Sequence, residues 1–224
     1  GDASYADSSA SALSGSISTL SAAAAATITN PASVSKTVGD SHIFSASPTT
    51  ASDGGTLSYQ WESATAASPS TYSSITGATS INYTTPTLAI GDNGSLYRVV
   101  VTNAINGTTT AATSSAATLT VAKAPLSAPT AITASTVSGS ATSLKIAFTN
   151  ASNATSYTAR IYLASDGTTL IATATSYTSN TAITGLSAGT AYKVTLTSVG
   201  DASYADSSAS ALSGSISTLS AAAA

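Results

Sequence analysis

Short alternating segments dominate the pattern of apolar and polar positions along this chain. Residues 57–61 read LSYQW and residues 97–101 read YRVVV, so that apolar side chains recur at every second position. This period is typical of strands that bury one face. The side chains expected to share the inward faces of these two strands are Leu57, Tyr59, Trp61, Tyr97, Val99 and Val101.

The alternation continues through the second half of the chain. Residues 117–122 (ATLTVA), 143–148 (SLKIAF) and 157–162 (YTARIY) follow the same period. Turn signals that combine Gly with Asp or Asn separate such segments, since these residues tolerate turn conformations. They occur at Ser52–Gly55, Gly91–Gly94 and Ser165–Gly167. Many short strands with regular turns predict an all-β fold of the sandwich type.

The run Ala22–Ala26 favours a helix by residue preference alone. It is only five residues long, and the sequences on both sides of it alternate like strands. Isolated helices shorter than about 12 residues are marginal in water. We therefore expect extended chain here, crossing a boundary between domains.

A perfect internal duplication organises the chain. The stretch GDASYADSSASALSGSISTLSAAAA occupies both Gly1–Ala25 and Gly200–Ala224, an offset of 199 residues. Such an identity is not a chance event and indicates a repeat architecture. We interpret Ala26–Ala224 as one period of a longer tandem array and Gly1–Ala25 as the end of the preceding period. The alternative is a subunit of 224 residues that carries a spare terminal strand.

Residues 27–122 resemble a bacterial immunoglobulin-like module. The motifs that carry the resemblance occur in order: LSYQW at 57–61, ITGATSINYT at 75–84, GDNGSLYRVVVTN at 91–103 and AATLTV at 116–121. The resemblance implies that Trp61 is the core tryptophan of the third strand and that Tyr97 forms the tyrosine corner. It also places Phe44 and Val99 in the core. The cysteine positions of antibody domains correspond to about Ala46 and Val99, so packing alone must join the sheets.

Residues 127–220 resemble a fibronectin type III module of bacterial surface proteins. The segments that carry this resemblance are TAITGLSAGTAYKVTLTSVGD at 181–201 and YADSSAS at 204–210. It implies that Tyr192 lies at the corner and that Val194 points inward. Phe148 stands where the family usually has tryptophan, and we expect it in the core of this module. The duplicated stretch would then contain the last connection and the last strand of this module.

These observations together predict an all-β chain of two β-sandwich modules in a tandem array, immunoglobulin-like and then fibronectin type III-like. We expect residues 1–25 to be the last strand of a preceding fibronectin-like module. The immunoglobulin-like domain is expected over residues 26–122, and the fibronectin type III-like domain over residues 123–224.

Low charge narrows the range of partners. Charged residues make up 7% of the chain, far below the roughly 25% of an average soluble domain. The net charge is −3, and the six Lys and Arg residues are dispersed, which argues against nucleic acid and against anionic membranes. No apolar run approaches the roughly 18 residues of a membrane span. A weakly charged surface favours self-association, so the expected partners are neighbouring repeats of the same chain, head to tail and in lateral contacts.

The sequence offers little for catalysis or cofactor binding. There is no cysteine, and the only histidine, His42, follows Ser41 within Gly39–His42. Neighbouring strand residues point to opposite faces. We therefore expect His42 to be an exposed strand histidine and expect no catalytic residue, cofactor or metal.

Calcium is the metal that oxygen ligands such as these aspartates favour. Calcium requires about six to eight oxygen ligands, and the acidic residues lack the spacing of a dedicated site. A weak interdomain site at Asp201 or Asp206 stays open as an alternative. Otherwise, we expect the aspartates to accept hydrogen bonds from their own turns.

Several positions could carry sugars. Five asparagines begin an N-x-S/T sequon, although a chain rich in Ser and Thr produces such triplets by accident. They are Asn82, Asn93, Asn106, Asn150 and Asn153.

Two classes of function fit the chain. The first is a structural unit of a long extracellular or cell-surface fibre that serves as a stalk, filament or spacer. The second is an adhesin segment whose loops bind glycans or a protein of a host or cell surface. The candidate loops at 66–70 and 135–141 are small, polar and uncharged, which favours the fibre.

Overall fold

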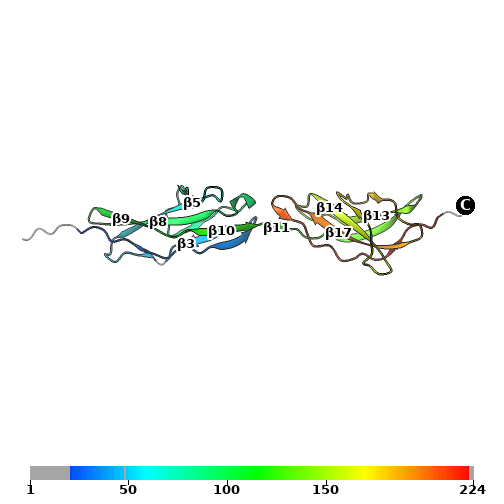
Figure 1. Cartoon of the computed structure of the whole chain (residues 1–224), viewed down its shortest axis with the longest axis horizontal. Helices are drawn as coiled ribbons and strands as arrows, with labels where there is room; N and C mark the ends of the chain where they lie inside the picture. The colour runs from blue at the N-terminus through cyan, green and yellow to red at the C-terminus, as the bar shows by residue number, and fades with distance from the viewer. Residues whose placement is uncertain (1–20, 48, 222–224) are drawn as a thin grey trace, which may run out of the picture.

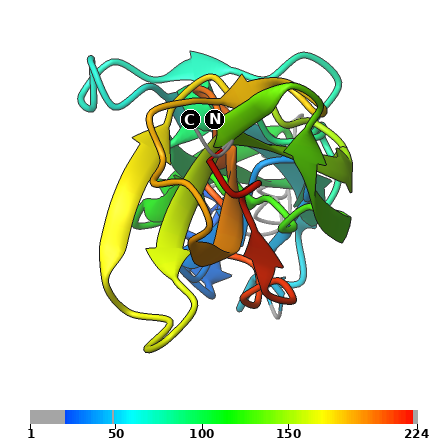
Figure 2. The same cartoon turned by 90° about the vertical axis from the view of Figure 1, so that its right-hand side faces the viewer.

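The computed structural model describes residues 21–47 and 49–221 and is almost entirely β. Two lobes lie end to end along one axis, with the described chain entering at one tip and leaving at the other (Figure 1). Viewed along that axis, the second lobe lies in front of the first (Figure 2). The expectation of an all-β fold of sandwich modules is confirmed.

The described residues of the first lobe form ten short strands and one 3₁₀ turn, η1 (Ile90–Asp92). Its main sheet has the order β2-β10-β8-β5-β6, with β9 also paired to β8, and the pairs β1-β4 and β3-β7 complete the lobe. The strands are β1 (Thr27–Ile28), β2 (Val34–Thr37), β3 (Ile43–Ser45), β4 (Thr49–Thr50), β5 (Thr56–Ala64), β6 (Ser73–Ser74), β7 (Asn82–Thr84), β8 (Leu96–Ile105), β9 (Thr108–Thr113) and β10 (Ala117–Ala122).

Trp61 lies at the centre of the first core. Its side chain is fully buried, lies opposite Val99 in the β5–β8 register, and donates a hydrogen bond from Nε1 to the Ser80 carbonyl at 3.0 Å. Phe44 packs against it from β3 with ring centroids 6.3 Å apart. The buried apolar residues of this core are Ala26, Phe44, Ala46, Trp61, Leu88, Tyr97, Val99, Val101, Ala117, Leu119 and Val121.

Tyr97 does not form the expected tyrosine corner. Its ring stacks on Phe44, with centroids 4.7 Å apart, and on Tyr83 at 5.8 Å. Within the described residues, the Tyr97 hydroxyl makes no hydrogen bond. Burial raises its pKa to about 12, because the low-dielectric surroundings disfavour the phenolate. Tyr97 is therefore a packing residue of the aromatic cluster.

The second lobe contains two facing sheets, β12-β13-β16 and β15-β14-β17-β19, and a short pair β11-β18 at its entrance. The core between the sheets consists of Leu144, Ile146, Ala159, Ile161, Tyr177, Ile183, Leu186, Tyr192, Val194 and Leu196. The strands are β11 (Ala124–Pro125), β12 (Thr130–Val137), β13 (Ser140–Thr149), β14 (Ser156–Leu163), β15 (Leu170–Ala174), β16 (Ala182–Ile183), β17 (Ala191–Val199), β18 (Tyr204–Ala205) and β19 (Ile216–Ser217).

Two aromatic residues of this lobe have different places in the core. Tyr192 is 1% exposed, and its hydroxyl accepts a hydrogen bond from the Ser187 N–H at 3.0 Å, five residues earlier, as in a tyrosine corner. Phe148 is only half-buried and packs edge-to-face on Tyr157 at 4.6 Å. The centre of this core is therefore aliphatic around Leu144 and Ile146, and Phe148 lies at its margin.

The expected last strand of the second lobe is irregular. Between β18 and β19, the residues Ser207, Ser210 and Ser213 contact Ser198, Leu196 and Val194 of β17, in that order. Each serine N–H donates to the facing carbonyl, and each serine Oγ accepts from the N–H of that same residue, at 2.8–3.0 Å. Three residues on one side thus face two on the other, which is a repeated β-bulge.

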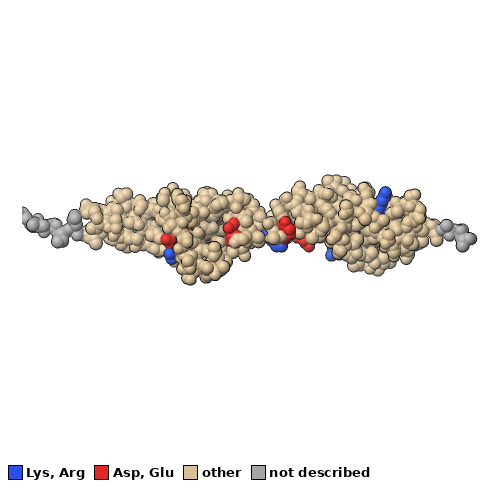
Figure 3. All heavy atoms as spheres, turned by 90° about the horizontal axis from the view of Figure 1, so that it is seen from above, with Lys and Arg blue, Asp and Glu red and all other residues tan. Residues whose placement is uncertain are grey.

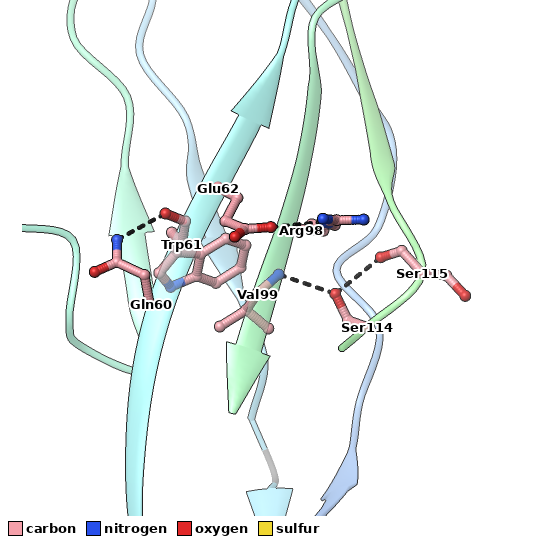
Figure 4. Close-up of polar contacts among 7 residues, drawn as sticks. All are labelled: Gln60, Trp61, Glu62, Arg98, Val99, Ser114 and Ser115. Carbon is pink, nitrogen blue, oxygen red and sulfur yellow. Dashed lines mark hydrogen bonds and ion pairs between the residues drawn. The ribbon is translucent and has the colours of Figure 1, made fainter. Parts of the chain in front are cut away.

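The same serine contact occurs once in the first lobe. The Val99 N–H donates to Ser114 Oγ at 3.0 Å, and Ser114 Oγ donates to the Ser115 carbonyl at 2.9 Å (Figure 4). In both lobes a serine hydroxyl therefore completes the hydrogen bonding of a buried strand where regular pairing stops.

Candidate functional site at the module junctions

The polyalanine segment Ser21–Ala26 lies against the outer tip of the first lobe. This tip consists of the β8–β9 hairpin and the turn that precedes β5. The hairpin closes with Asn106 and Gly107, both at positive φ (50° and 79°), as a type I′ turn requires. Figure 1 shows β9 at the end of the lobe where the described chain enters. We call this tip the alanine socket, formed by Asp53, Asn103, Thr108 and Thr110.

Asp53 and Asn103 hold the backbone of Ala24 on both sides. The Ala24 N–H donates to Asp53 Oδ2 at 2.7 Å, and Asn103 Nδ2 donates to the Ala24 carbonyl at 2.9 Å. Asn103 Nδ2 also donates to both Asp53 oxygens, at 2.8 and 3.0 Å. The two side chains are therefore hydrogen-bonded to each other and together bind the N–H and the C=O of Ala24.

Two threonines of β9 extend the alanine socket. Thr110 Oγ1 donates to the Ala23 carbonyl at 2.6 Å, and Thr108 Oγ1 donates to the Ser21 carbonyl at 3.4 Å. The Ala23 methyl is buried, with 5% of the residue exposed. The socket thus recognises an extended backbone with a small side chain at one buried position.

Glycine at position 55 makes room for Asn103. A Cβ on Gly55 would lie 2.0 Å from Asn103 Oδ1 and 3.0 Å from the Ala104 carbonyl, so no other residue fits without moving the amide. Asn103 is fully buried, and its Oδ1 has no hydrogen-bond partner among the described residues. The fixed amide therefore directs its donor group towards Ala24 and Asp53.

The alanine socket lowers the pKa of the Asp53 carboxyl below its ordinary value of 3.8. The largest cause is the hydrogen bond from the Ala24 N–H, followed by those from the Asn103 side chain and the Gly55 N–H. Each of these donors stabilises the charged form. The contact between Asp53 and Ala24 should therefore be complete above about pH 4 and weaken as pH falls through the lowered pKa.

An acid titration monitored by NMR tests this coupling. We expect the Ala24 amide resonance to move with an apparent pKa below 3.8, because the proton that neutralises Asp53 removes the acceptor of that amide. In Asp53→Asn the movement should be absent. A midpoint at or above the ordinary carboxyl value would contradict the assignment.

The junction between the two lobes is a nearly continuous strand. Only Lys123 separates β10 of the first lobe from β11, and β11 pairs in parallel with β18 of the second lobe. The Ala124 N–H donates to the Ser203 carbonyl at 3.0 Å, and Lys123 Nζ donates to the Asp201 carbonyl at 2.5 Å. With its backbone groups paired on both sides of one residue, this junction has little freedom to bend.

The loop that receives the linker is closed by its own side chains. Asp201 Oδ1 accepts from the N–H groups of Ser203 and Tyr204 at 2.7 and 2.9 Å, and Asp206 Oδ1 accepts from the Gly200 N–H at 2.9 Å. A Cβ on Gly200 would lie 2.1 Å from the Tyr204 carbonyl. This loop opens the duplicated 25-residue stretch, and Ser220–Ala224, which matches Ser21–Ala25, closes it. The duplicated sequence therefore carries elements of both junctions.

Charged side chains are sparse elsewhere. In Figure 3 uncharged residues cover nearly all of the visible face, and some of the few charges lie beside the narrowing between the lobes. The described residues contain one ion pair, Arg98 Nε to Glu62 Oε2 at 2.7 Å (Figure 4), and the Arg98 guanidinium lies 3.7 Å from the Tyr72 ring centroid. The two charged side chains are half-buried, with 32% of Arg98 and 18% of Glu62 exposed, and an ion pair that water still reaches has a small effect on stability.

His42 is not the exposed strand residue that the sequence predicts. It precedes β3, is half-buried, and packs edge-to-face on Phe44 with centroids 4.7 Å apart. Burial lowers the pKa of its imidazole. The aromatic core attracts this side chain, which the alternating pattern alone did not indicate.

The acidic residues are the candidate metal ligands of the described part of the chain. No group of three or more His, Cys, Asp or Glu side chains converges to hold a metal ion among these residues. Asp201 and Asp206 instead accept hydrogen bonds from their own loop.

All five sequon asparagines are exposed, although Asn93 Oδ1 accepts from the Val121 N–H at 2.9 Å. The expected strand at 1–25 falls almost wholly outside the described residues. The described chain contains no helix long and apolar enough to cross a membrane.

The fold resembles known tandem sandwiches, whereas neither a protein-family model nor a curated protein matches the sequence. The FN1–FN3 domains of chicken CNTN1 align with 14% identity and a TM-score of 0.39, covering 85% of this chain and 66% of that one. Consecutive domains of titin align with 15% identity and a TM-score of 0.39, covering 87% and 66%. The FN5 domain of Drosophila Lar aligns with 16% identity and a TM-score of 0.33, covering 45% of this chain and all of that one. The likeness concerns the immunoglobulin-like and fibronectin type III β-sandwich fold alone.

Proposed function

We propose that the chain is a structural repeat unit of a long extracellular or cell-surface fibre, resembling the giant surface proteins of bacteria, in which immunoglobulin-like and fibronectin-like modules alternate. The observation that carries this proposal is the duplicated 25-residue stretch. It supplies the loop that receives the linker in the second lobe, and it ends in the residues that the alanine socket of the first lobe holds. Repetition of the 199-residue period would therefore reproduce both junctions each time.

The mechanism of such a fibre is geometric. The lobes lie end to end, and each has its own core, so that length can grow by duplication without changing either fold (Figure 1). Strands of about ten residues rise roughly 3.3 Å per residue, which gives each lobe a length of some 35–40 Å. One period should then advance by about 70–80 Å.

The surface supports contact between neighbouring fibres. With few charges to repel one another, rods of this kind can approach closely. Leu170 and Ile171 are 50% and 42% exposed on β15, which forms one edge of its sheet. We propose that lateral contacts use this edge. Rods that stay dispersed in moderate salt at neutral pH would argue against lateral contacts.

Electron microscopy of the native material tests the fibre directly. We expect continuous density with an axial repeat near 70–80 Å, because two lobes alternate along one line. Discrete particles of about 21.6 kDa would overturn the proposal and would favour the spare-strand interpretation of residues 1–25.

Pulling single molecules tests whether the lobes are independent. We expect two unfolding events for each 199 residues, since the two cores share no residue. The described residues include no cysteine to lock either lobe, so both events should be reversible. One all-or-none event for each period would contradict this independence.

A further inference from the structure

We propose that the alanine socket is a docking site for the segment Ser220–Ala224 of a second copy of this chain. The inference deepens the proposed fibre and rests on it, because it names the residues through which one unit holds the next. The occupant is an extended, uncharged segment with small side chains, and the contact runs head to tail.

The socket contacts favour this occupant because they consist of hydrogen bonds to backbone atoms and the packing of one buried methyl group. Asp53 accepts from the Ala24 N–H, Asn103 donates to the Ala24 carbonyl, and Thr110 donates to the Ala23 carbonyl. Ser220–Ala224 has the same five residues in the same order as Ser21–Ala25. Every donor, acceptor and methyl that the socket requires is therefore available in the second segment.

The geometry assigns this occupant to another copy. The chain is fixed as far as Leu219, whose carbonyl accepts from the Gly189 N–H at 3.0 Å, and Ser220 and Ala221 beyond it are exposed. They leave the second lobe at the tip opposite to the socket of the same chain (Figure 1). The socket that this segment meets is therefore that of a copy in line with the first, and not the socket formed by Asp53 and Asn103 at the other tip.

The covalently attached segment competes for the same place. In the described structure Ser21–Ala26 fills the socket, and a tethered segment has a high local concentration. A segment of a separate molecule that makes a few hydrogen bonds binds weakly, with a dissociation constant on the order of 1 mM. Docking of a second copy should therefore become visible once the resident segment is released.

Replacing Ala24 by Pro in the full chain releases the resident segment selectively. Proline has no N–H to donate to Asp53, whereas the matching residue Ala223 stays intact. We expect the average mass of Ala24→Pro in sedimentation equilibrium to rise between 0.1 and a few mM, on the order of the expected dissociation constant. The unchanged chain should stay at one mass. The Asn103 side-chain amide resonances should return towards their original positions as the concentration increases.

Two further variants identify the contact. Ala24→Pro combined with Ala223→Pro should lose the association, and so should Ala24→Pro combined with Asp53→Asn. Adding Asp166→Asn instead is the matched control, since Asp166 closes a similar turn in the second lobe, far from the socket. Association that persists without the Ala223 N–H, or no association at millimolar concentration, would overturn the docking site.

Failure of the docking site and failure of the fibre are distinguishable. Thermal unfolding of Ala24→Pro should still show two folded lobes, with a decrease confined to the first lobe, because Ala24 belongs to neither core but the neighbouring Ala26 belongs to the first. If Ala24→Pro is folded but stays monomeric, the docking site is overturned. The axial repeat expected in electron micrographs, which tests the fibre, does not depend on that result. Discrete particles in micrographs overturn the fibre, while the concentration series still decides the socket.

Discussion

Replacing Trp61 by Ala is expected to destabilise the first lobe by about 3–5 kcal/mol and to leave the second lobe unchanged. Removing a fully buried aromatic side chain loses its transfer free energy and leaves a cavity that the surroundings fill only in part. The Ser80 carbonyl also loses the indole N–H that it accepts at 3.0 Å. Because single domains are stable by only about 5–15 kcal/mol, this loss removes a large part of the total.

Amide NMR during denaturant unfolding provides the measurement, since it reports each lobe separately. The transition of the first lobe should move to lower denaturant, and that of the second should stay in place. Tyr192→Ala is the reciprocal control, because Tyr192 is buried in the second core alone. If either variant shifts both transitions together, the lobes are not independent folding units.

Replacing Ser207, Ser210 and Ser213 together by Ala is expected to destabilise the second lobe by about 3–9 kcal/mol. Each serine Oγ is the acceptor for a backbone N–H of β17, and the residues that donate, Val194, Leu196 and Ser198, are fully buried. A buried donor that loses its partner costs about 1–3 kcal/mol. The triple variant should therefore have a marginal or unfolded second lobe and a normal first lobe.

Three exposed serines, two from the bulged segment and one from β19, supply the control. Ser208, Ser215 and Ser217 are exposed and give no hydrogen bond to β17 through their hydroxyls in the described structure. Their replacement by Ala should change the unfolding free energy by no more than about 0.5 kcal/mol. Equal effects of the two triple variants would mean that loss of hydroxyls in general, and not the bulged contacts, causes the destabilisation.

The bulged segment also explains how this edge of the sheet avoids unwanted pairing. A regular edge strand exposes a row of free N–H and C=O groups to other chains, and bulges interrupt such a row. The period of three in Ser207, Ser210 and Ser213 is visible in the sequence. Its meaning is not visible, because the residues that face it on β17 are spaced by two.

The elements and the core could be predicted where local pattern and burial agree. Alternation placed Trp61 and Val99 on inward faces, the fibronectin resemblance placed Val194 there, and all three are fully buried. The same alternation contains a signal for the alanine socket. Asn103 continues the inward series of β8 after Val101, and a polar residue at such a position requires a specific partner.

The errors arose where neighbours from distant segments decide the outcome. His42 packs against Phe44, so it is half-buried and not exposed. Tyr97 stacks between Phe44 and Tyr83 and forms no corner among the described residues. Phe148 lies at the margin of its core, because Leu144 and Ile146 occupy the centre.

The sequence by itself determined the all-β class, the two sandwich modules in order and the duplicated stretch, since these follow from the period of the side chains and from identity along the chain. Only the tertiary structure decided what the duplicated stretch does. The contacts of Asp53 and Asn103 with Ala24, and of the Ser203 carbonyl with Ala124, join residues 29, 79 and 79 positions apart. Their partners are backbone groups, which every residue except proline presents alike, so no local pattern marks them in advance.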